Sequence, residues 1–232
     1  MLTSSVENYL KTIYYLQHET GWASTSAIAD HMAVANPSVT MMLKRMAVMQ
    51  PPLISYTPYE GARLTPAGEK QALEVIRVHR LMETFLVRVL SYTWDEVHAD
   101  ADRLEHASSP LLIERISALL GDPVRDPHGE DIPDRNGLLP NRSELPLTNL
   151  TAGQSGRITR VAADKPEILR YLGEIGLNLD VTVEVLDKAP FEGPLTIHSS
   201  ESGSDHALGR EVTNRIFIDA AGDPYDLKKN LY

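Results

Sequence analysis

Apolar residues recur at steps of three and four through the first half of the chain, which is the spacing of one face of a helix. The pattern is interrupted by glycine, by proline and by short polar turns, so it separates into several helices. It predicts helices over residues 4–19, 24–33, 36–46, 66–92, 94–106 and 109–120. From about residue 150 the pattern changes to apolar runs of strand length with one short helix at 166–176, which is typical of a small SH3-like barrel.

The second and third of these helices are joined by a brief turn at Val34-Ala35, which is the helix-turn-helix pattern. Asn36 is expected to cap the third helix, with Pro37 in its first position. Two β-like runs around Tyr59-Glu60-Gly61 then predict a hairpin. A helix-turn-helix followed at once by a hairpin indicates a winged helix, a fold used for DNA binding and, alternatively, for protein contact.

The side of the third helix that lies outside its apolar stripe would enter the major groove. Basic residues there would contact phosphate, and the others would touch base edges or thymine methyl groups. The expected DNA-binding residues are Pro37, Ser38, Thr40, Met41, Lys44 and Arg45, with Arg63 in the wing.

The fold class predicted from these patterns is mainly α with β. It has an N-terminal winged helix-turn-helix at 1–73, a helical domain at 74–140, a linker at 141–150 and a C-terminal SH3-like β-barrel at 151–232. The helical domain carries more apolar surface than its size requires, at Leu111, Leu112, Ile116, Leu119 and Leu120. We therefore expect a homodimer, whose two-fold symmetry would match a palindromic DNA site.

Composition narrows the possible chemistry. The chain has no cysteine, which excludes disulfides and thiolate metal sites and fits a reducing cytoplasm. No apolar stretch approaches the length of a membrane helix, and the start does not have the pattern of a signal peptide, so we expect a cytoplasmic protein without a membrane partner. The net charge of −10 is concentrated in residues 74–140, where seven Lys and Arg stand against thirteen Asp and Glu.

The stretch 94–106 carries His98, Asp102, Glu105 and His106 on or beside one helical face. Carboxylates gathered in this way repel one another, and a divalent cation would remove the repulsion. Because only oxygen and nitrogen donors are present, the set favours Mn²⁺ or Fe²⁺. The plainer interpretation is a solvated acidic helix face.

Further candidate ligands lie outside that helix. His79 and Glu83 are four residues apart in a strongly apolar helix, where a buried charge needs a partner. Asp126 and His128 lie two apart in the irregular stretch 121–148. We find no phosphate loop, nucleophile elbow or dinucleotide fingerprint.

Six short motifs together resemble the diphtheria toxin repressor and manganese transport regulator (DtxR/MntR) family of metal-dependent repressors. They are ENYLKTIY, PSVTMMLKRM, RLTPAGE, HRLMETFL, HADADRLEH and DPHGEDIP, and the resemblance covers the whole chain. It implies that residues 74–140 bind metal and form the dimer, and that the C-terminal part is FeoA-like.

The resemblance also implies two metal sites. The primary site would use Asn8, Asp102, Glu105 and His106. The ancillary site would use His79, Glu83 and His98, completed by Asp126, His128 and Asp164. Iron-type members usually have a sulfur ligand where this chain has Asp102 and often Met where it has Asn8, whereas manganese-type members commonly have Asp in place of Asn8 and a second acid in place of Lys11.

The predicted function is that of a transcriptional repressor of metal homeostasis, activated by Mn²⁺ or alternatively Fe²⁺ to bind double-stranded operator DNA as a homodimer. It would not be an enzyme. The alternative is a small metallohydrolase that uses the same His, Asp and Glu cluster, although this would leave the winged helix unexplained.

Overall fold

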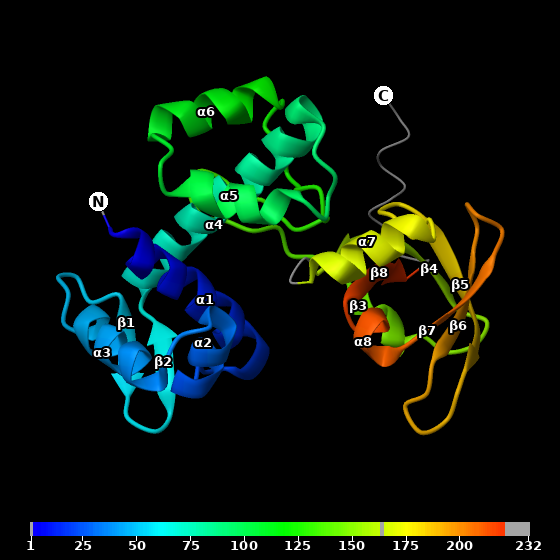
Figure 1. The fold of residues 1–232 in the computed structure, drawn as a ribbon, viewed down its shortest axis with the longest axis horizontal. Helices are drawn as coiled ribbons and strands as arrows, with labels where there is room; N and C mark the ends of the chain where they lie inside the picture. Colours follow the sequence, from blue (N-terminus) through cyan, green and yellow to red (C-terminus); the bar gives the residue numbers. More distant parts are fainter. Residues whose placement is uncertain (1, 163–164, 221–232) are drawn as a thin grey trace. The chain divides into compact units, whose positions relative to one another are not determined.

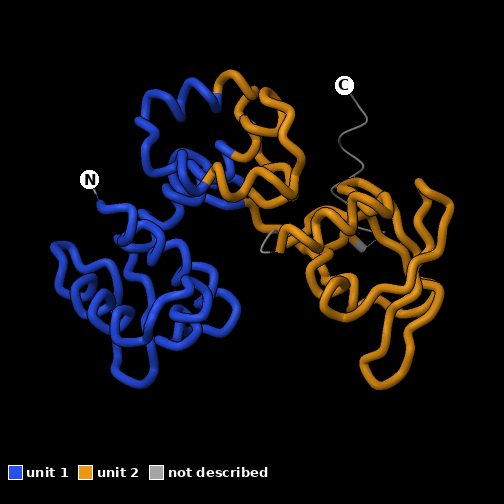
Figure 2. The backbone as a smooth tube through the Cα atoms, in the orientation of Figure 1, with its two compact units in different colours: residues 1–82, 102–117, 132–139 blue, residues 83–101, 118–131, 140–232 orange. Residues whose placement is uncertain are grey.

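The computed structural model describes residues 2–162 and 165–220 and divides into two compact units. Unit 1 comprises residues 1–82, 102–117 and 132–139, and unit 2 comprises 83–101, 118–131 and 140–232 (Figure 2). Three helices, α4 (Pro66–Leu90), α5 (Val97–Glu105) and α6 (Pro110–Leu119), each begin in one unit and end in the other. The candidate ligands on α4 and α5 are therefore distributed between the two units.

Unit 1 contains the expected winged helix-turn-helix (Figure 1). Its elements are α1 (Ser4–Thr20), α2 (Thr25–Met32), α3 (Asn36–Ala47), β1 (Ile54–Thr57) and β2 (Gly61–Leu64). Side chains cap two of the helices, because Thr3 accepts a hydrogen bond from the Val6 amide and Ser24 accepts one from the Ala27 amide. The predicted cap of α3 is wrong: Ala35 holds that position without a side-chain bond, and Asn36 is already helical.

The core of unit 1 is formed by apolar side chains from all three helices and the hairpin, including Leu10, Ile13, Ile28, Leu43 and Ile54. The wing is held against the segment before α2, since the backbones of Ala23 and Ala62 exchange two hydrogen bonds of 3.0 and 2.9 Å. Gly61 is required beside this contact: it has φ +124°, and a Cβ there would lie 2.3 Å from the Ala23 carbonyl oxygen.

Helix α5 is shorter than the stretch 94–106 suggested, because it begins at Val97 after a turn. Val97 and Ala101 are buried, whereas Leu104 is exposed. Trp94 lies before the helix and packs against the apolar core of the sheet in unit 2. An indole ring gains a large buried apolar area by packing against such a core.

Unit 2 contains the C-terminal sheet, in the antiparallel order β3-β8-β4-β5-β6-β7. Its strands are β3 (Leu145–Pro146), β4 (Ser155–Val161), β5 (Thr182–Lys188), β6 (Leu195–Ser199), β7 (Asp205–Leu208) and β8 (Ile216–Ala220). Helix α7 (Pro166–Glu174), the short helix α8 (Arg210–Thr213) and the 3-10 turn η1 (Leu147–Asn149) accompany them. Strands β3 and β7 are the two edges, so the pairing among the described residues does not close into a barrel.

Two details of this sheet were not predicted. Strand β3 and η1 lie within the stretch 141–150 that was predicted as a linker. The run 206–212, within the part predicted as strands, divides into β7 and α8 at Gly209, which precedes α8 as its N-cap.

Candidate metal centre

In unit 1, the end of α5 lies against the first turns of α1. His106 follows the last residue of α5, and its Nε2 lies 2.8 Å from Asn8 Oδ1 and 3.3 Å from Glu105 Oε1. Its Nδ1 lies 2.6 Å from a carboxylate oxygen of Glu7. Two predicted ligands of the primary site, Glu105 and His106, therefore converge with a third, Asn8. A metal ion at Nε2 would replace the proton that this nitrogen donates to Asn8.

A second group of donors lies beside the first and shares Glu105 with it. His79 Nδ1 lies 2.6 Å from Glu105 Oε2 and 3.3 Å from Asp102 Oδ1. The ligand atoms of His79, Asp102 and Glu105 all lie within 4.8 Å of one another, which is a spacing that could hold a metal ion. His79 and Glu105 are buried, whereas Asp102 is half-buried. We call these three residues the inner cage.

The ammonium group of Lys11, from α1, lies in the inner cage. Its Nζ donates to Asp102 Oδ1 at 2.7 Å and to Glu105 Oε1 at 2.9 Å, and it lies 3.5 Å from His79 Nδ1. Burial alone would lower the pKa of Lys11, but the negative charges of Glu105 and Asp102 outweigh it and raise that pKa. Lys11 therefore carries a full positive charge among these donors.

In unit 2, a third group is formed by Glu83 of α4 with Asp126 and His128 of the loop that follows α6. All three side chains are buried, and their ligand atoms lie within 4.8 Å of one another. The Asp126 carboxylate accepts hydrogen bonds from the amides of His128 and Glu130 at 2.8 and 2.9 Å. These bonds form an Asx-type turn that brings His128 back toward Glu83.

The His128 ring is oriented for ligation. Its Nε2 donates to the Trp94 carbonyl oxygen at 2.6 Å, and its Nδ1 is buried without a hydrogen-bond partner, 3.7 Å from Glu83 Oε2. A second-shell bond of this kind fixes which nitrogen faces a metal ion. Burial lowers the pKa of His128, but the interaction with Glu83 and the charge of Asp126 raise it to about 9. A bound metal ion would displace that proton.

The remaining predicted ligands are less central. His98, at the start of α5, is half-exposed and pairs with Glu83 through Nδ1 at 3.2 Å. His79 lies one helical turn before Glu83 in α4. Asp164 lies outside the described residues, so its proposed contribution stays a prediction.

The predicted DNA-binding face is exposed. Pro37, Ser38, Met41, Lys44 and Arg45 are exposed on α3, and Thr40 is partly buried and donates to the Asn36 carbonyl oxygen. Met41 has 71% of its surface exposed, so its thioether is accessible to a partner on this face. The guanidinium of Arg63 lies 4.2 Å from the centre of the Trp22 ring, so its position in the wing is fixed by a cation–π contact.

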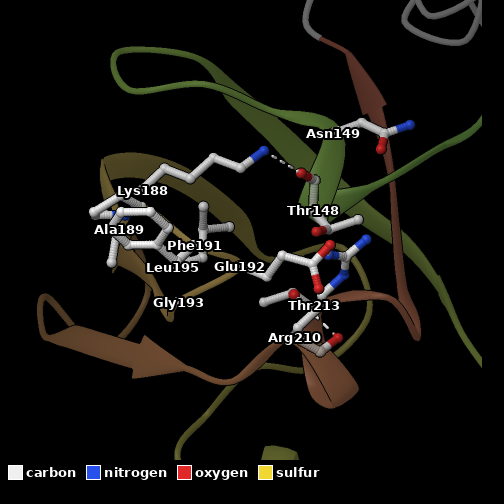
Figure 3. A pocket seen from close by; sticks show the side chains of 11 residues that line it. Thr148, Asn149, Lys188, Ala189, Phe191, Glu192, Gly193, Leu195, Arg210 and Thr213 are labelled. Atoms are coloured by element: carbon white, nitrogen blue, oxygen red, sulfur yellow. Dashed lines mark hydrogen bonds and ion pairs between the residues drawn. The ribbon is translucent and has the colours of Figure 1, made fainter.

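A hollow of about 460 Å³ lies in the sheet domain and includes none of the candidate ligands (Figure 3). Its charged residues are already paired, because Lys188 donates to the Thr148 carbonyl at 2.7 Å and Arg210 forms an ion pair with Glu192.

Comparison with known proteins agrees with this geometry. Residues 1–62 match the family described as the iron dependent repressor, N-terminal DNA binding domain. Residues 65–134 match its metal binding and dimerisation domain, and residues 145–220 match the FeoA domain. The iron-dependent repressor IdeR of Mycobacterium tuberculosis is 35% identical over 199 residues, which cover 79% of this chain and 85% of the relative. The chain belongs to the DtxR/MntR family of metal-dependent repressors.

The chain is also similar to a regulator named MntR and to a solved manganese-dependent repressor. The transcriptional regulator MntR of Bacillus pumilus is 35% identical over 120 residues, which cover 52% of this chain and 81% of that protein. A solved structure described as a manganese-dependent transcriptional repressor in complex with manganese has a TM-score of 0.85 and 34% identity, and the match covers 93% of this chain and 99% of that one.

This DtxR/MntR chain is therefore a metal-dependent, DNA-binding transcriptional repressor of metal homeostasis. Its relatives bear the names of repressors, so the alternative of a metallohydrolase has no support. Within the described residues, no helix is both long and apolar enough to cross a membrane.

Three contributors to these groups were not among the predicted site residues. Glu7 contacts His106, Lys11 lies in the inner cage and the Trp94 carbonyl orients His128. Lys11 had a signal in the sequence, since the family resemblance implies an acid at this position in manganese-type members. The Trp94 contact had none, because a backbone carbonyl carries no residue-specific pattern.

Proposed function

We propose that Mn²⁺, in preference to Fe²⁺, activates this repressor, and that the active form is a cytoplasmic homodimer bound to a palindromic operator, without enzymatic activity. The observation that carries the proposal is the convergence of Asn8 from α1 with Glu105 and His106 at the end of α5. An ion held by these residues would tie the DNA-binding helices to the helix that bears the metal ligands.

The donor set supports manganese. Asn8, Asp102, Glu105 and His106 offer oxygen and nitrogen only, and no sulfur ligand occupies the position of Asp102. Sites of this composition suit Mn²⁺, whereas iron-type members of the family usually place sulfur there. The buried group of Glu83, Asp126 and His128 has the same character, and we infer that it takes a second ion, with His98 and Asp164 as further ligands.

The proposal implies a route from metal to DNA. In a two-fold dimer, the α3 helices of the two copies must enter successive major grooves, about 34 Å apart. A metal ion that ties α1 to α5 would restrict how the winged helix moves and would favour the spacing that fits DNA. The ion therefore acts as a ligand that selects the DNA-competent state.

The test is operator binding by the Glu105→Gln variant. The operator is first selected from random duplexes with the intact protein and Mn²⁺. We expect Glu105→Gln to reduce the Mn²⁺-dependent affinity for the operator by roughly a hundredfold. Substitution of residues that hold or orient a metal ion has effects of about this size. Glu19→Gln, which changes an exposed acid of α1, serves as the control. Wild-type affinity and metal response in Glu105→Gln would refute the assignment.

A further inference from the structure

The inner cage has the donors of a divalent-cation site, yet a side chain of the same protein supplies the cation. Lys11 Nζ makes contacts of 2.7 and 2.9 Å with the carboxylates of Asp102 and Glu105. A metal ion in the cage would need the same oxygens at about 2.0–2.2 Å. An ammonium group and a metal ion cannot both occupy this space.

We propose that Lys11 is a resident cation of the metal centre, which keeps a metal ion out of the inner cage and limits unit 1 to a single ion at the primary ligands Asn8, Asp102, Glu105 and His106. The proposal rests on the proposed function and specifies how many ions that centre takes. In this proposal Lys11 takes the place of a metal ion, whereas the primary ligands hold one.

The electrostatics favour this arrangement over an incidental surface contact. Glu105 is buried and its side chain is 1% exposed, and that of Lys11 is 13% exposed. Breaking a buried pair by removing one partner is costly because the remaining charge is left uncompensated. With Lys11 in place, one of the cage's two negative charges is compensated before any metal arrives, so a divalent ion entering it would have to displace the ammonium group.

The position of Lys11 also affects the ion proposed at the primary site, beside His106. Glu105 Oε1 faces both Lys11 Nζ at 2.9 Å and His106 Nε2 at 3.3 Å. Lys11 therefore orients the carboxylate that the neighbouring ion would share. It also connects α1 to α5 without metal, so the metal adds to an existing link.

The experiment counts Mn²⁺ ions in the full-length protein by calorimetry and electron paramagnetic resonance. Lys11→Glu replaces the ammonium group with a carboxylate and should bind one more ion per chain than wild type. Two ions that share Glu105 would lie about 4 Å apart and should give a magnetically coupled signal that wild type lacks. Lys70→Glu makes the same charge change at an exposed position of α4 and should bind as many ions as wild type.

Lys11→Met provides a second variant that loses the charge without adding a ligand. Its vacant cage should bind an Mn²⁺ ion that the wild-type cage does not take, because the competing ammonium group is absent. Circular dichroism with and without Mn²⁺ establishes that each variant is folded when its ions are counted.

The proposal is overturned if wild type itself gives the coupled two-ion signal, or if folded Lys11→Glu and Lys11→Met gain no ion. The absence of that signal in wild type, with a gain in either variant, supports it. A wild-type protein that binds Mn²⁺ but not DNA would refute the proposed function while leaving the ion count, and therefore the role of Lys11, intact.

Discussion

Among single residues of unit 2, His128 combines full burial with two acidic neighbours. Its side chain is fully buried, yet Glu83 and Asp126 raise its pKa from 6.5 to about 9. Between about pH 6.5 and 9, His128 of the metal-free protein therefore holds a proton in the folded state that it releases in the unfolded chain. The stabilisation is complete below about pH 6.5 and is lost as the pH rises through about 9.

This gives a prediction for the metal-free protein in the presence of a chelator. Between pH 6.5 and 9.5, wild type should lose on the order of 3 kcal/mol of unfolding free energy that a His128→Gln variant does not lose. Urea unfolding followed by Trp94 fluorescence, in a Trp22→Phe background, measures this in unit 2. His31→Gln, at an exposed histidine, should behave as wild type. Equal pH dependence in His128→Gln and wild type would contradict the raised pKa.

At the level of elements, the buried and exposed sides of α3 have different roles. Its buried face, Val39, Leu43 and Met46, holds the helix in the core of unit 1. Its last turn presents Lys44 and Arg45 to solvent, where they are placed to meet phosphate rather than bases.

We therefore predict that Lys44→Ala and Arg45→Ala each weaken binding to all DNA sequences alike. Each should make the slope of log K against log salt concentration shallower by about one unit, since one counterion fewer is released. Titrations at several salt concentrations with operator and random duplexes measure the slope. Lys165→Ala, which removes a charge in the sheet domain, should leave it unchanged. An unaltered slope in both α3 variants would remove these residues from the interface.

At the level of the whole molecule, α6 leaves apolar side chains without partners in the described chain. Leu111 and Leu119 are each 67% exposed and Leu112 is 47% exposed, whereas Ile116, which was also predicted for the dimer interface, is buried within its own chain. Exposed leucines on one helix are the usual composition of a subunit interface. They support the proposal that this helix contacts a second copy.

Introducing a charge there should prevent association. Leu111→Asp is expected to sediment as a monomer at concentrations where wild type is a dimer, and to lose most of its operator affinity, because a buried unpaired carboxylate is costly. Leu138→Asp is a matched control, since Leu138 is also 67% exposed in unit 1 but lies outside the helix. A Leu111→Asp protein that remains dimeric would place the interface elsewhere.

The sequence by itself determined the local elements, because helical and strand periodicity, caps and turns act over a few residues. The winged helix, the stripe on α5 and the burial of His79 and Glu83 were all predictable from such patterns. The start of α5 was misplaced by three residues, because the burial of Trp94 depends on a sheet more than fifty residues later in the chain.

Only the tertiary structure decided which of the candidate ligands meet. The candidate ligands form one group around His106, one around Lys11 and one around His128. Glu105 belongs to the first two groups. Contacts between α1 and α5 join residues more than ninety positions apart, and spacing along the chain carries no information about such pairs. The place of Lys11 among the acids follows from the packing of two helices, since buried carboxylates are stable only beside a cation that the fold brings to them.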